Sequence, residues 1–122
     1  MLLNAPAQPA GRAVAFMAGS LLPDLDHVPL LVTRPLPSVD DPRPVTHCLL
    51  AVAPVAAAAA VTRSATASAL AAGMLAHFAR DLAVGTGAPL LWPATGRSFG
   101  IPYKAYAAAC ALLAIRAVLR KG

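Results

Sequence analysis

Four apolar segments, separated by loops rich in proline or glycine, dominate the pattern of hydrophobic and polar positions along the chain. No stretch alternates apolar and polar residues with the period of two that is typical of a half-buried strand. The pattern therefore predicts an all-α protein with helices at about residues 11–22, 46–62, 64–83 and 103–119. Because short connections place consecutive helices antiparallel, we expect a small antiparallel bundle of about four apolar helices.

Two loops of unusual composition connect these helices. Residues 23–45 contain six prolines, which exclude helix and favour a stiff, extended path. Residues 84–102 carry glycines and prolines around the apolar run 89–93, which also indicates a loop of defined shape. In an antiparallel bundle both loops lie at the same end, so the polar residues beside them are expected to meet there.

The composition resembles that of a membrane protein. Hydrophobic residues make up 58% of the 122 residues and charged residues only 12%. Residues 49–61 are apolar on every side, and such a helix must be covered by protein or by lipid. Because the apolar runs stay below the roughly 18 to 20 residues of a transmembrane helix, both a spanning and a monotopic arrangement stay open. We expect one domain over residues 1–122, in the inner or cytoplasmic membrane with lipids as partners; the oligomeric state is undetermined.

The charges argue against some other classes of protein. The net charge is +5, but the basic residues are scattered singly, so we expect no nucleic-acid binding and attribute the charge to anionic lipid headgroups or membrane orientation. All five acidic residues are aspartates, although glutamate is the better helix former, which suggests that they serve turns or local chemistry. Cys48 and Cys110 lack the spacing of a zinc ribbon or a redox pair.

Polar residues that can bind a metal gather at the end where the two loops meet. They are Asp24, Asp26 and His27 after the first helix, His47 at the start of the second, and His77 and Asp81 late in the third. A spacing of four places His77 and Asp81 on one helix face, one turn apart. Gly73, one turn earlier, leaves space for a ligand or for a neighbouring helix.

This concentration of imidazoles and carboxylates predicts a divalent-metal site. Carboxylates in an apolar protein are costly to bury without a cation that neutralises them. Imidazole and carboxylate ligands suit zinc best, with manganese or iron as alternatives. We expect four residues to contact the metal: Asp26, His47, His77 and Asp81. Asp24 and His27 are expected beside it, as ligands or hydrogen-bond partners.

Four motifs in this region resemble those of the YdjM-like family of predicted inner-membrane metal-dependent hydrolases, over about residues 19–102. They are Gly19-Ser20-Leu21-Leu22-Pro23-Asp24-Leu25-Asp26-His27, Arg43-Pro44-Val45-Thr46-His47, Gly73-x3-His77-x3-Asp81 and Gly87-Ala88-Pro89-Leu90-Leu91-Trp92-Pro93. That family is distantly similar to the zinc-dependent phospholipase C and single-strand nuclease group. By that resemblance the metal ligands are Asp26 (or Asp24), His47, His77 and Asp81. The family usually has a further histidine before the first helix, whereas residues 1–22 contain none here. This difference implies either an incomplete second metal position or a start that omits residues.

The leading functional hypothesis is metal-assisted hydrolysis of a phosphoester or lipid-like substrate. Asp24 or His27 would act as base or would orient another group, and Arg43, Arg80 and Arg97 would bind an anionic group of the substrate. An alternative role for the arginines is to neutralise the aspartates or to mark a membrane boundary. The alternative is a non-catalytic small membrane protein, in which a structural metal or a salt-bridge network holds the helices together. A carrier or channel has less support because the chain shows no internal repeat.

Overall fold

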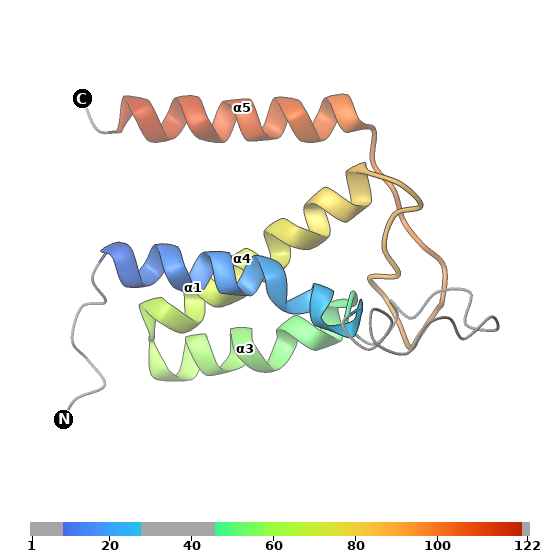
Figure 1. Cartoon of the computed structure of the whole chain (residues 1–122), viewed down its shortest axis with the longest axis horizontal. Helices are drawn as coiled ribbons and strands as arrows, with labels where there is room; N and C mark the ends of the chain where they lie inside the picture. The colour runs from blue at the N-terminus through green and yellow to red at the C-terminus, as the bar shows by residue number, and fades with distance from the viewer. Residues whose placement is uncertain (1–8, 28–45, 121–122) are drawn as a thin grey trace.

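The computed structural model describes residues 9–27 and 46–120, including all side chains in those ranges except those of residues 26 and 27. Four α-helices and one short 3-10 helix form this part of the chain (Figure 1): α1 (Pro9–Leu21), η1 (Leu22–His27), α3 (Leu49–Thr62), α4 (Ala65–Ala83) and α5 (Tyr103–Leu119). Within these ranges there is no strand, and a single antiparallel bridge joins Ala88 to Phe99. The all-α prediction is confirmed, and α5 has the predicted bounds.

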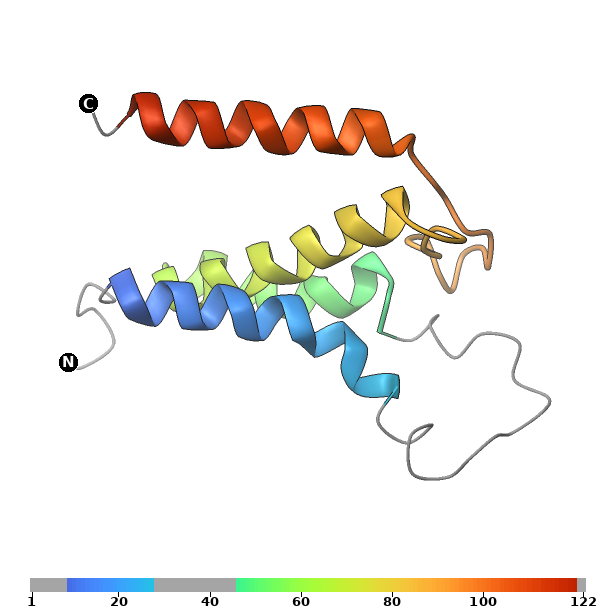
Figure 2. The same cartoon turned by 45° about the horizontal axis from the view of Figure 1, so that its top comes forward.

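Successive helices alternate in direction, as Figures 1 and 2 both show. The C-terminal end of α1, the N-terminal end of α3 and the C-terminal end of α4 therefore lie at one end of the molecule. Helix α4 is central, because both α1 and α3 pack against it. Its first turn is stabilised by Ser64, whose hydroxyl accepts a hydrogen bond from the backbone N–H of Ala67 at 3.2 Å.

Two glycines allow α1 and α4 to pack with their backbones in close contact. A Cβ atom added at Gly73 would overlap Phe16 O of α1 and lie 2.8 Å from Ser20 N. A Cβ added at Gly19 would overlap Leu70 O of α4 in the same way. The space beside Gly73 is thus filled by the neighbouring helix, which is one of the two uses expected from the sequence.

The loop after α4 folds back onto the ends of two helices. Leu90 O accepts a hydrogen bond from Leu49 N at 2.9 Å and so satisfies one of the first N–H groups of α3. Ile101 N donates to Leu82 O at 2.6 Å, which holds the end of the loop against α4. Leu90 also packs on the small core formed by α3 and α4, whose buried members are Val52, Ala71, Met74 and Phe78. The glycine- and proline-rich segment is therefore a shaped loop, as predicted.

Helix α5 stands apart from the other helices. Among the described elements it packs only against α4, and none of its residues is buried. The expected bundle of about four helices is thus not confirmed: α1 and α3 each pack against α4, whereas α5 contributes no buried residue. In the described parts of the chain, none of the helices combines the length and the apolarity needed to cross a membrane.

Candidate metal centre

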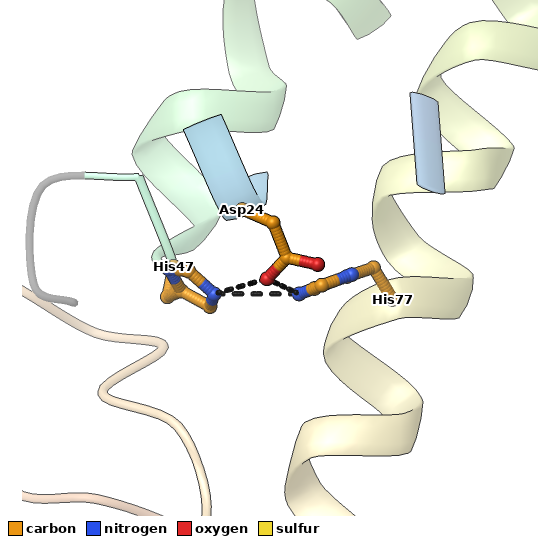
Figure 3. Close-up of side chains that lie close together, drawn as sticks. All are labelled: Asp24, His47 and His77. Atoms are coloured by element: carbon orange, nitrogen blue, oxygen red, sulfur yellow. Dashed lines mark hydrogen bonds and ion pairs between the residues drawn. The ribbon is translucent and has the colours of Figure 1, made fainter. Parts of the chain in front are cut away.

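Three segments that are distant in sequence bring polar side chains to the end shared by α1, α3 and α4. Asp24 comes from η1, His47 from the turn that precedes α3, and His77 and Asp81 from the last turns of α4. In Figure 3 the carboxylate of Asp24 reaches between the two imidazole rings. The position of η1 directly after α1 is what carries Asp24 to this point.

Each of the two carboxylates has an oxygen atom within 4 Å of both imidazole Nε2 atoms. His47 Nε2 and His77 Nε2 are 3.3 Å apart. Asp24 Oδ1 is 3.5 Å from His77 Nε2 and 3.9 Å from His47 Nε2, the contacts drawn in Figure 3. Asp81 Oδ2 is 3.1 Å from His77 Nε2 and 3.4 Å from His47 Nε2. Both carboxylates therefore approach the same pair of imidazole nitrogens.

The backbone of α1 defines the proton position on His77. His77 Nδ1 lies 2.7 Å from Ser20 O. A carbonyl oxygen can only accept, so Nδ1 carries the hydrogen, and in the neutral ring Nε2 then has a free lone pair. A metal-binding histidine is commonly oriented by a hydrogen bond of this kind from its other ring nitrogen.

Thr46 has the corresponding role for His47. Its hydroxyl donates to Pro23 O at 3.2 Å, and its oxygen lies 3.1 Å from His47 Nδ1. Because the hydroxyl hydrogen is used by Pro23 O, the oxygen accepts from Nδ1–H, which leaves the lone pair on Nε2. In their neutral forms, both imidazoles therefore present the lone pair of Nε2 toward each other.

This arrangement is suited to a cation. His47 and His77 are only 1% and 5% exposed, whereas the Asp24 side chain is 49% exposed, so two deeply buried imidazoles lie beside a carboxylate that solvent can reach. Two facing lone pairs next to two carboxylates repel one another unless a positive charge lies between them. Asp24, His47 and His77 form a candidate metal site, because one ligand atom from each lies within 4.8 Å of the other two.

The spacing of these atoms can be compared with the size of a zinc site. Ligands at 2.0–2.2 Å around a tetrahedral ion are roughly 3.3 to 3.6 Å apart along each edge. The nitrogen–nitrogen distance of 3.3 Å and the Asp24–His77 distance of 3.5 Å fall in that range. The 3.9 Å between Asp24 and His47 is slightly longer. The side chains present thus fit a small divalent ion without a change of backbone.

Some of the residues proposed from the sequence lie elsewhere or outside the described side chains. The backbones of Asp26 and His27 belong to η1, but their side chains are outside the described part of the chain, as is Arg43. Arg80 lines a cavity that also includes Asp24 and His77. Arg97 is exposed on the loop after α4, where its backbone N–H donates to Thr95 Oγ1, and it does not line this cavity.

Thr46 and the carbonyl group of Ser20 were not among the site groups predicted from the sequence, although both residues belong to the four quoted motifs. The only feature of the sequence that could have indicated the role of Thr46 was its hydroxyl group directly before His47.

We expect Thr46→Val to weaken metal affinity by about 10- to 100-fold, since it removes the acceptor of His47 Nδ1–H. Thr46→Ser keeps the hydroxyl and should retain most of the affinity. Zinc titration with a competing chelator measures both variants, and equal affinities for both would contradict this role.

The fold and the site define a class of protein: an all-helical protein with a candidate site for one divalent metal, built from one carboxylate and two imidazoles with a second carboxylate adjacent. The chain belongs to the YdjM inner membrane protein family, whose sequence model matches residues 1–121. This membership places the protein in the inner membrane. Searches of curated proteins and of solved structures gave no significant match.

Proposed function

We propose that this protein is a metal-dependent hydrolase of the inner membrane that acts on a phosphoester or lipid-like substrate. The observation that carries the proposal is the convergence of two lone-pair-bearing Nε2 atoms and a carboxylate at 3.3–3.9 Å, beside a cavity. A divalent ion held there would supply Lewis acidity and lower the pKa of water. Zinc is the metal that this donor set favours, with manganese or iron as alternatives.

Each side chain of the site has a distinct proposed role. His47 and His77 hold the ion through Nε2, while Thr46 and Ser20 O keep their rings in place. Asp81, only 18% exposed and one turn after His77, is the proposed fourth ligand. Asp24 combines contact with both imidazoles and exposure to the cavity. We therefore propose that Asp24 also accepts the proton of the attacking water, and that this proton passes to the departing alcohol.

Membrane lipids are the proposed partner of α5. Its apolar side chains are largely exposed, with Leu112 at 67% and Val118 at 71%. An apolar surface of this extent on a soluble monomer marks an interaction site. Because the chain belongs to an inner membrane protein family, lipid is available to contact this apolar surface of α5. A lipid-like substrate would reach the site from the same phase.

The hydrolase proposal is tested on protein purified in detergent and loaded with zinc. We expect hydrolysis of a phosphoester, either a soluble aryl phosphate or a phospholipid in mixed micelles, to disappear with a chelator and to return with zinc. Protein with Asp24→Asn, assayed at a zinc concentration that saturates the variant, should lose at least about 100-fold in kcat if the carboxylate serves as base. Zinc that raises the melting temperature while no ester is cleaved would favour the alternative function, a non-catalytic membrane protein with a structural metal.

A further inference from the structure

A cavity of about 240 Å³ opens directly beside the candidate metal centre. Its lining residues come from α1, η1, α4 and α5 and are Ser20, Leu21, Asp24, Ala76, His77, Arg80 and Tyr106. Two of the three residues of the candidate metal site, Asp24 and His77, are part of this lining. A molecule in the cavity is therefore in contact with the groups that would hold the ion.

Arg80 provides the positive charge of this cavity. Among the described residues that line the cavity it is the only lysine or arginine, and it lies three positions after His77 on the same face of α4. Within the described residues its guanidinium forms no ion pair with a carboxylate, and the four ion pairs of the site all join a histidine to an aspartate. The role of neutralising the aspartates, which the sequence left open for Arg80, has no support in these contacts.

Tyr106 faces the same cavity from α5. It is the one residue of α5 that is half-buried, whereas the other residues of the helix are exposed. A side-chain hydrogen bond with Cys110 raises the pKa of Tyr106 above its ordinary value, whereas the charge of Arg80 acts to lower it. The phenol therefore stays protonated and uncharged at neutral pH, with its O–H donated to Cys110.

We propose that this cavity binds the phosphate group of the substrate, with Arg80 as the residue that selects a phosphate ester over a neutral ester. The inference rests on the proposed function and assigns its substrate class. A guanidinium offers paired N–H donors that match two phosphate oxygens, and the uncharged phenol of Tyr106 adds no negative charge to the cavity. In the reaction, the oxygen of water bonds to phosphorus, the bond from phosphorus to the ester oxygen breaks, and the alcohol leaves with one proton of the water.

The first test measures binding, independently of activity. Inorganic phosphate is titrated into zinc-loaded protein in detergent and followed by calorimetry. We expect Arg80→Gln to weaken phosphate binding by at least about 10-fold, and Arg80→Lys by less, since lysine keeps the charge but not the paired donors. Arg116→Gln, an exposed arginine on α5 away from the cavity, is the matched control and should bind phosphate like the parent. Equal phosphate affinity in the Arg80→Gln and parent proteins would overturn the proposal.

The metal content of each variant separates a phosphate-binding role from support of the metal centre. Zinc content of Arg80→Gln equal to that of the parent supports the proposal, whereas a loss of zinc in that variant overturns it. Hydrolysis that is unaffected by Arg80→Gln would refute the phosphate site and leave the hydrolase proposal intact. Phosphate binding that depends on Arg80 without cleavage of any ester would refute the hydrolase proposal and leave the anion site standing.

A second arm identifies the source of the phosphate group. A soluble aryl phosphate and vesicles containing phosphatidic acid present the same headgroup chemistry in solution and in a lipid surface. Competition by the aryl phosphate for inorganic phosphate, with no effect of the vesicles, assigns a soluble ester. Competition by phosphatidic acid vesicles, but not by vesicles of phosphatidylcholine alone, assigns a lipid. Competition by neither would contradict a phosphate-ester site.

Discussion

Replacing His77 by alanine is expected to remove most of the bound metal from the protein. Its Nε2 atom contacts all three other members of the cluster, at 3.3 Å from His47, 3.5 Å from Asp24 and 3.1 Å from Asp81. Loss of a partner that only orients a ligand typically costs 10- to 100-fold in metal affinity. Removal of a ligand atom itself should exceed that, so we expect a loss of more than about 100-fold.

Elemental analysis after gel filtration, together with titration against a competing chelator, measures the effect. Arg63→Ala is the control, because Arg63 caps α3 at the end opposite to the site. His47→Ala should lose metal to a similar extent, and a helical circular dichroism spectrum shows whether each variant is folded. If His77→Ala and Arg63→Ala retain equal amounts of zinc, the candidate metal centre is wrong.

The second large effect is expected at Gly73, where alanine should destabilise the protein by about 3 kcal/mol. In a solvated helix the same change stabilises by up to about 1 kcal/mol, since alanine is the better helix former. Here the added Cβ would overlap the backbone oxygen of Phe16, which no side-chain rotation can relieve. Helices α1 and α4 would have to separate, and the contact of His77 Nδ1 with Ser20 O would lengthen with them.

Gly11→Ala in the first turn of α1 is the matched control, because a Cβ there meets nothing within 4 Å. Thermal unfolding in detergent should show the two substitutions changing stability in opposite directions. Gly73→Ala should also bind zinc less tightly than the parent. A Gly73→Ala protein as stable as the parent would contradict the close packing of α1 on α4.

Much of the site could be predicted because its components are local. The spacing of four between His77 and Asp81 places them one turn apart in any α-helix, and the structure shows both beside His47. The sequence prediction preferred Asp26 to Asp24 as the ligand, and this preference stays a prediction because the Asp26 side chain lies outside the described residues. The described member of that pair, Asp24, lies beside the imidazoles.

The packing of α5 could not be predicted from its composition. Its apolar residues resemble those of α3, so the apolar pattern predicted that both helices pack in the same bundle. The structure packs α3 against α4 and leaves α5 without a buried residue. The apolar pattern of a helix indicates that it needs an apolar environment, but it does not specify whether protein or lipid provides that environment.

The sequence by itself determined the helical class, the helix boundaries to within a few residues, and the end of the molecule at which the histidines gather. These properties follow from periodicity and from proline and glycine positions, which act over a few residues. Only the tertiary structure decided which nitrogen of each imidazole faces the other. That choice depends on acceptors supplied through contacts between distant segments: Ser20 O lies 57 positions from His77, and Thr46 is tied to Pro23 O, 23 positions away. Such contacts exist only after α1 has packed on α4, so no local pattern encodes them.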